Sequence, residues 1–123
     1  MPMTIQTLLT DYLAEIQKIY GLHLKSVFLY GSYARGDFTQ DTDVDVMILV
    51  DLAVEEMEEY LDELAEIGFD YNVAYGIWMM PVVRNQKHFE HWAKAYFFYE
   101  NVQKEGVKIY EAACPYRYRS QNG

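Results

Sequence analysis

The sequence predicts an α/β fold in which flanking helices cover a small, mixed and twisted sheet. Two kinds of segment alternate along the chain. Stretches with apolar residues every three or four positions are typical of amphipathic helices, and short continuous apolar runs are typical of buried strands. A length of 123 residues with 51% hydrophobic residues suits one domain with one core. We expect that domain to span residues 1–112, followed by a flexible C-terminal tail at 113–123.

The first four expected elements precede residue 51. Apolar residues recur at helical spacing from Thr4 to Tyr20, which predicts a helix. Ser26 to Tyr30 reads as a short strand, and Tyr33 to Arg35 is expected to form a brief helix. Val44 to Val50 is almost continuously apolar, so it should be a central strand that is buried on both faces.

The second half is expected to contain a second long helix and a third strand. Leu52 to Ile67 has an apolar stripe on an acidic background, and Gly68 is the expected end of that helix. Tyr71 to Met80 is the expected third strand, closed by Pro81 because proline has no N–H to donate to a sheet. Two short helices and a short strand complete the prediction, at residues 85–96, 99–105 and 107–110.

The formal net charge is −9, and the acidic residues are concentrated in the first part of the chain. Residues 1–70 hold 15 of the 19 acidic residues and only three lysines or arginines. Such a surface repels phosphates, which argues against direct binding of nucleic acid. A polyanionic substrate would need metal cations as a bridge, and a partner protein with a basic face is compatible with this charge.

The sequence also indicates a reducing compartment. Cys114 is the only cysteine, so neither a disulfide nor a cysteine-based zinc site is expected. Neither a signal-like leader nor an apolar stretch long enough to span a membrane is evident. We therefore expect a cytoplasmic protein without a membrane partner.

Two aspartates interrupt the start of the predicted central strand. Asp43 and Asp45 are two residues apart, so on a strand both side chains project to the same face. Two like charges at a buried strand repel each other and lose hydration, which raises one pKa or requires a cation. Mg²⁺ suits this arrangement because it binds one or two carboxylates and completes its shell with water and phosphate oxygens. An isolated pair of this kind also fits a solvent-facing loop cap.

A glycine–serine turn precedes the aspartates and favours the nucleotide interpretation. Gly31 and Ser32 directly follow the first predicted strand. A glycine lets the backbone approach a phosphate closely, and a hydroxyl with neighbouring N–H groups can cradle it. A strand, a glycine–serine turn and an aspartate pair in this order are more specific than any one of them alone.

The segment GSYARGDFTQDTDVD resembles the GS-x10-DxD signature of the polymerase-β-like nucleotidyltransferases. The short chain is similar to the minimal nucleotidyltransferase (MNT) antitoxins that pair with HEPN toxins. The segment FFYENVQKEGVKIYEA, residues 97–112, is similar to the ending of those minimal proteins. The resemblance therefore covers most of the chain, from about Val27 to Ala112.

The resemblance implies a function and a role for each matching residue. Asp43 and Asp45 would be the catalytic Mg²⁺ ligands, Gly31 and Ser32 the phosphate-binding turn, and Arg35 a phosphate or partner contact. ATP would donate AMP to a tyrosine hydroxyl of the HEPN toxin in a hetero-oligomer, and adenylylation would silence the toxin. Two alternatives remain open at this point: neutralisation by binding alone, and nucleotidyl transfer to a small hydroxyl compound.

One departure from the family pattern concerns a third carboxylate, which active members carry on the strand after the second helix. In the register expected for Tyr71 to Met80, Ala74 takes that position, and Asn72 and Asp70 share its face. Asp70 is then four residues away, about 13 Å at 3.3 Å per residue. That distance is too long for a bond of about 2.1 Å to the same metal ion.

Other candidate groups are weaker. His88 and His91 have a helical spacing that could bind a metal, but no third ligand is evident nearby, and His23 is expected to be an ordinary loop residue. Aromatic and methionine residues gather at positions 78–80 and 92–99. Most should be in the core, and the surplus could form a partner-binding face together with Arg117 and Arg119 of the tail.

Overall fold

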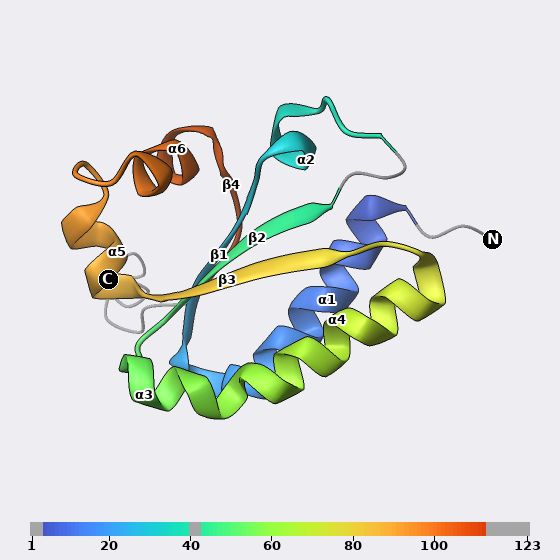
Figure 1. Ribbon diagram of the computed structural model, residues 1–123, viewed down its shortest axis with the longest axis horizontal. Coiled ribbons are helices and arrows are strands. Elements are labelled where there is room, and N and C mark those ends of the chain that lie inside the picture. Colours follow the sequence, from blue (N-terminus) through green and yellow to red (C-terminus); the bar gives the residue numbers. More distant parts are fainter. Residues whose placement is uncertain (1–3, 40–42, 113–123) are drawn as a thin grey trace, which may run out of the picture.

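The computed structural model describes residues 4–39 and 43–112, and it is an α/β domain with one four-stranded sheet (Figure 1). The helices are α1 (Ile5–Tyr20), α2 (Ser32–Arg35), α3 (Val54–Met57), α4 (Leu61–Tyr75), α5 (Gln86–Trp92) and α6 (Phe97–Glu105). The strands are β1 (Leu24–Tyr30), β2 (Val44–Val50), β3 (Met79–Asn85) and β4 (Val107–Glu111). Short 3₁₀ turns occupy Gly21–His23 and Glu58–Tyr60.

The sheet is mixed, with strand order β3-β2-β1-β4. Strand β1 is antiparallel to both β2 and β4, whereas β2 and β3 are parallel and joined through α3 and α4. This order confirms the predicted α/β fold class and the central position of β2. It also leaves β3 at one edge of the sheet.

The two faces of the sheet carry different cores. Alternate residues of β2, beginning at Val44 and Val46, face the larger core against α1 and α4. Figure 1 shows these two helices side by side on one face of the sheet, and the hydroxyl of Tyr71 on α4 donates a 2.7 Å hydrogen bond to Asp11 on α1. The larger core therefore closes one face along the whole length of β2.

The opposite face of the sheet is only partly covered. Its smaller core joins Met47 and Leu49 of β2 to Phe89 of α5 and to Tyr99 and Val102 of α6. Asp45 lies on this same face, because the side chains of a strand alternate. On this face α5 and α6 cover Met47 and Leu49 in the second half of β2, whereas Asp45 in the first half is only partly covered.

Most elements predicted from the sequence are confirmed. The first helix has Thr4 as its N-cap, since the Thr4 side chain accepts a hydrogen bond from the Thr7 N–H. The predicted strand Val44–Val50 is matched residue for residue. The short strand before Gly31, the short helix after it and the short strand that starts at Val107 also form, with boundaries shifted by one or two residues.

Two predictions in the middle of the chain were wrong. The second helix does not end at Gly68, because α4 continues to Tyr75 and ends at Gly76, whose φ of 68° is in the left-handed region. Residues Tyr71–Tyr75 are therefore helical, and the third strand starts only at Met79. Pro81 lies inside that strand, which is tolerated because β3 is an edge strand.

Some expectations fall outside the described residues. The tail at 113–123, with Cys114, Arg117 and Arg119, is among them, so its flexibility stays a prediction. Within the ranges 4–39 and 43–112, no helix combines the length and the hydropathy needed to cross a membrane.

Candidate active site

The antiparallel pairing of β1 and β2 brings the two sequence motifs together. Tyr30, the last residue of β1, is paired with Asp45 near the start of β2. Gly31 directly follows Tyr30, and Asp43 directly precedes β2. The glycine–serine turn and the aspartate pair are therefore neighbours at one end of the sheet, although ten residues separate Ser32 from Asp43 in the chain.

Gly31 is the closest point between the two motifs. Its backbone has φ 73° and ψ −149°, a conformation that is essentially restricted to glycine. A Cβ atom built on Gly31 would collide with the carboxylate of Asp45. The absence of a side chain at Gly31 therefore lets the Asp45 carboxylate lie directly against the turn.

The Asp45 carboxylate is half-buried beside a second carboxylate, that of Asp43. Its pKa is raised above the ordinary value, first by burial and then by the charge of Asp43, while the positive charge of Arg35 acts in the opposite direction. Among the described residues, no side chain forms a hydrogen bond or an ion pair with Asp45. A cation at this position would relieve both the lost hydration and the repulsion.

Arg35 connects the turn to the loop that follows it. Its guanidinium donates a 3.3 Å hydrogen bond to the Ser32 hydroxyl and another of 3.3 Å to the Asp37 carboxylate. Arg35 is exposed, and its charge lowers the pKa of Asp45. All five residues singled out from the sequence, Gly31, Ser32, Arg35, Asp43 and Asp45, therefore lie in one cluster.

The donor set fits a divalent ion that also binds phosphate. Asp43 and Asp45 offer hard carboxylate oxygens on one face, and the first turn of α2 begins beside them at Ser32. No group of three or more potential metal ligands occurs within residues 4–39 and 43–112. Two carboxylates with room for other oxygens match Mg²⁺, which keeps waters and substrate phosphates in its shell.

The structure corrects the residue expected in place of a third carboxylate. Ala74 lies on helix α4 together with Asn72 and Asp70, so none of them belongs to the strand beside Asp45. The register of β3 instead pairs Met80 with Asp45, and the Trp78 carbonyl accepts a 2.9 Å hydrogen bond from the Val44 N–H. The prediction failed because it started the third strand at Tyr71, whereas β3 starts at Met79.

Met80, Val82 and Arg84 of β3 lie on the face of Asp45, and Trp78 comes just before the strand, two residues ahead of Met80. Two of these side chains are half exposed, at 50% for Trp78 and 46% for Met80, whereas Met79 between them is buried. This alternation places Trp78 and Met80 on the face of Asp45. Trp78 and Met80 are two residues apart, as Asp43 and Asp45 are. This match could be found in the sequence only with β3 correctly placed at Met79–Asn85.

Tyr30 is a further residue of the site that sequence reasoning missed. It is the pairing partner of Asp45, and its ring lies 5.5 Å from that of Phe98 on α6, measured between centroids. Burial raises the Tyr30 pKa, the charge of Asp45 raises it further, and Arg84 opposes both. Tyr30 therefore lies between the Asp45 carboxylate and α6.

The histidines have structural partners. The Tyr99 hydroxyl and His88 Nδ1 are 3.4 Å apart, and the His88 ring also packs near Trp92 and Tyr96. No histidine takes part in a group that could hold a metal within the described ranges. His23, expected to be an ordinary loop residue, lies 2.7 Å from the Asp51 carboxylate through its Nδ1 atom.

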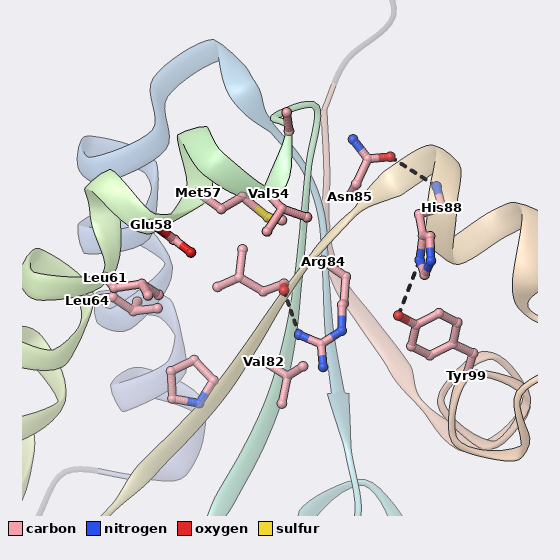
Figure 2. Close-up of a pocket in the computed structure, with 13 residues that line it drawn as sticks. Val54, Met57, Glu58, Leu61, Leu64, Val82, Arg84, Asn85, His88 and Tyr99 are labelled. Carbon is pink, nitrogen blue, oxygen red and sulfur yellow. Dashed lines mark hydrogen bonds between the residues drawn. The ribbon is translucent and has the colours of Figure 1, made fainter.

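A cavity of about 720 Å³ lies elsewhere, along the outer edge of β3. Figure 2 shows Val54 and Leu61 on one side, His88 and Tyr99 on the other, and Arg84 between them. Neither aspartate of the pair lines this cavity. This cavity is therefore separate from the aspartate pair, and the carboxylates identify the candidate active site.

Comparison with known proteins identifies the family. The nucleotidyltransferase domain family matches residues 9–109, which include both motifs and all four strands except the last two residues of β4. The chain belongs to the nucleotidyltransferase family. The strand, turn and aspartate order that suggested this activity in the sequence is thus part of a match over most of the domain, and the protein is a nucleotidyltransferase.

Two curated relatives have names that specify the transfer. A chain of Methanocaldococcus jannaschii, provisionally named a protein adenylyltransferase, is 25% identical over 111 residues, which is 88% of this chain and all of that one. The protein adenylyltransferase MntA of Thermococcus cleftensis is 31% identical over 71 residues, which is 54% of this chain and 70% of that one. These similarities confirm the resemblance to the MNT proteins.

A solved structure supports the fold. A chain in the crystal structure of the toxin–antitoxin MntA–HpeT, in a variant with two aspartate-to-glutamate substitutions, matches with a TM-score of 0.50. The match covers 83% of this chain and 73% of that chain at 14% sequence identity. At this identity the likeness concerns the arrangement of strands and helices.

Proposed function

We propose that this nucleotidyltransferase transfers AMP from ATP to a tyrosine of a HEPN-type toxin and thereby neutralises the toxin in a hetero-oligomeric complex. The observation that carries the proposal is the half-buried Asp45, whose pKa is raised beside Asp43 and whose carboxylate lies against the Gly31 turn. Relatives named protein adenylyltransferases supply the choice of AMP as the transferred group, and hence of ATP as its donor.

Asp43 and Asp45 are the residues that would hold Mg²⁺. Bound there, the ion neutralises charge on the transferring phosphate and helps to align it. Through the β1–β2 pairing the chain positions Asp45 beside the turn, with Asp43 directly before β2. A cation bound there would oppose the effects of burial and of Asp43 that raise the pKa of Asp45.

The turn after β1 would bind the β- and γ-phosphates of ATP, which leave as pyrophosphate. Gly31 gives backbone access, and Ser32 follows it directly at the start of α2. The Ser32 hydroxyl already accepts a hydrogen bond from Arg35, so a phosphate there would meet a hydroxyl and a guanidinium together. These groups bind and orient the triphosphate without forming a covalent intermediate.

The test uses the protein purified with its co-expressed partner. With ATP labelled at the α-phosphate and Mg²⁺, we expect label on the partner, and Asp43→Asn should abolish it. Asp51→Asn is the matched control, because Asp51 is an aspartate at the other end of β2. Mass spectrometry of the labelled partner should locate AMP on a tyrosine.

A second candidate function is neutralisation by binding alone. One observation favours it: β3 carries no acidic residue, so the aspartate pair has no carboxylate facing it from that strand. This candidate would be supported, and transfer rejected, if wild type and Asp43→Asn both formed a stable complex that protects cells while neither labelled the partner.

A further inference from the structure

The face of the sheet beside the aspartate pair has two unlike sides. On the β1 side lie the Gly31 turn and Arg35, which suit phosphate. On the β3 side, nearest to Asp45, lie the half-exposed side chains of Trp78 and Met80, which offer apolar and aromatic surface, and Arg84 follows further along the strand. Because β2 runs between β1 and β3, the carboxylates separate these two sides.

The chemistry of transfer assigns a role to each side. In a displacement at the α-phosphate, the attacking oxygen and the leaving oxygen are roughly in line. If pyrophosphate leaves toward the Gly31 turn, the acceptor hydroxyl must approach from the opposite side of the carboxylates. That side is β3, where the acceptor meets Trp78 and Met80.

The β3 side also limits which hydroxyl can react. Neither β3 nor the preceding residues Gly76–Trp78 contain an acidic residue that could take the acceptor proton. A tyrosine hydroxyl has a pKa of about 10, whereas water, and aliphatic hydroxyls like it, are near 15.7. An aryl hydroxyl is therefore much easier to ionise where β3 provides no carboxylate base.

We infer that Trp78 and Met80 form the acceptor-binding surface, with Trp78 stacking on the ring of the acceptor, and that this surface restricts the enzyme to aryl hydroxyls. The inference rests on the proposed function and adds a specificity determinant to it. Stacking positions the acceptor ring, since aromatic pairs attract each other beyond the effect of the area that they bury. The acidity of the phenol replaces a base on β3.

The step balances without a further reactant. The aryl oxygen forms a bond to the α-phosphorus, and the bond from that phosphorus to the bridging oxygen breaks. The bonding electron pair leaves with pyrophosphate, and the proton of the hydroxyl passes to solvent water. The products are the aryl ester of AMP, pyrophosphate and one proton.

The acceptor test uses three lysine-flanked peptides that differ at one position, which holds tyrosine, serine or phenylalanine. Basic flanks suit the acidic protein. With α-labelled ATP and Mg²⁺, we expect label on the tyrosine peptide and at least about 100-fold less on the serine peptide, equivalent to about 2.7 kcal/mol. Phenylalanine has no hydroxyl and should stay unlabelled.

Substitutions at Trp78 test the surface itself. Trp78→Ala should raise the KM for the tyrosine peptide about tenfold, with little change in KM for ATP, and Trp78→Phe should restore most of the affinity. Trp92→Ala is the matched control, because Trp92 is also partly exposed but lies on α5. Trp78→Asp should increase labelling of the serine peptide, since it adds a carboxylate beside the pair.

The outcomes separate this inference from the proposed function. Equal labelling of the tyrosine and serine peptides would overturn the inference, and so would an unchanged peptide KM in Trp78→Ala. Absence of label on every peptide and on the co-expressed partner would instead reject AMP transfer itself. Thermal unfolding of each variant identifies any loss of label that comes from misfolding.

Discussion

Asp45 and Asp51 lie at opposite ends of strand β2 and have opposite surroundings. Asp51, just past the last residue of β2, lies 2.7 Å from His23 and 3.4 Å from Lys25. Burial alone would raise the pKa of Asp51, but these two partners lower it. The pKa of Asp45 is raised, because burial and Asp43 outweigh Arg35.

The carboxylate after the end of β2 therefore has ion-pair partners, whereas the carboxylate near its start has none among the described residues. Asp51 is neutralised by side chains of the chain itself, so it can stabilise the fold. Asp45 is held against Gly31 beside a like charge, an arrangement that does not favour folding. A group kept at a cost to stability is a candidate for function, which is why Asp45 marks the active site.

The largest expected effect concerns catalysis. Asp45→Asn should reduce the rate of AMP transfer by about 10²- to 10³-fold, because it removes charge where the transferring phosphate must be stabilised. Asp51→Asn should leave the rate within about twofold, and it should lower the free energy of unfolding by about 0.2–1 kcal/mol. Initial rates with labelled ATP and urea unfolding curves measure the two effects. Equal loss of transfer in both variants would contradict the contrast.

The next effect concerns the glycine that holds Asp45 in place. Gly31→Ala should destabilise the fold by about 1–3 kcal/mol, because alanine is strained at this φ and ψ and its Cβ meets the Asp45 carboxylate. It should also lower AMP transfer as strongly as loss of the carboxylate. Urea unfolding and transfer assays read the two properties separately.

Gly76→Ala is the control for backbone strain. Gly76 ends α4 with φ 68°, and a Cβ there would meet no heavy atom within 4 Å. We expect a cost of about 1 kcal/mol and normal transfer. If both alanine variants lost stability but kept transfer, Gly31 would have no role beyond the turn.

The smallest effect is the dependence of stability on pH. A carboxyl group with a raised pKa in the folded state binds its proton more tightly there, so its contribution falls as the pH rises above the ordinary value of 3.8 through the raised pKa. Asp45→Asn should therefore gain stability relative to wild type as the pH rises through this window. Urea unfolding at a series of pH values measures the difference.

Asp51 should show the opposite sign. Its pKa is lowered from 3.8, so its stabilisation is complete above that value and is lost as the pH falls through the lowered pKa. The difference between wild type and Asp51→Asn should disappear at the acidic end of the series. Curves of the same sign for both variants would show that the two carboxylates have similar surroundings.

The sequence predicted the parts of this site that depend on local pattern. The continuous apolar run at Val44–Val50 indicated β2, and the order of Gly31, Ser32, Asp43 and Asp45 indicated one cluster. Antiparallel pairing of consecutive strands then places Tyr30 beside Asp45, since strands that follow one another in the chain usually lie next to each other in the sheet.

The third strand could not be placed from local pattern. Residues Tyr71–Tyr75 include aromatic and β-branched side chains that favour strands, but packing of Tyr71 against α1 keeps them helical. Gly68 is tolerated within α4, where a Cβ atom would come no closer than 3.9 Å to its nearest neighbour, the Met79 carbonyl oxygen. Tertiary contacts therefore decided the helix end, and with it which residues face the aspartates.

The most direct measurement is calorimetric titration of Mg²⁺ with a non-hydrolysable ATP analogue into wild type, Asp45→Asn and Asp51→Asn. We expect saturable binding to wild type and Asp51→Asn with similar affinities, and at least about tenfold weaker binding to Asp45→Asn, since Asp43 and Asp45 would hold the cation that neutralises the phosphates. Equal affinity in all three proteins would contradict the assignment of Asp43 and Asp45 as the metal- and nucleotide-binding pair.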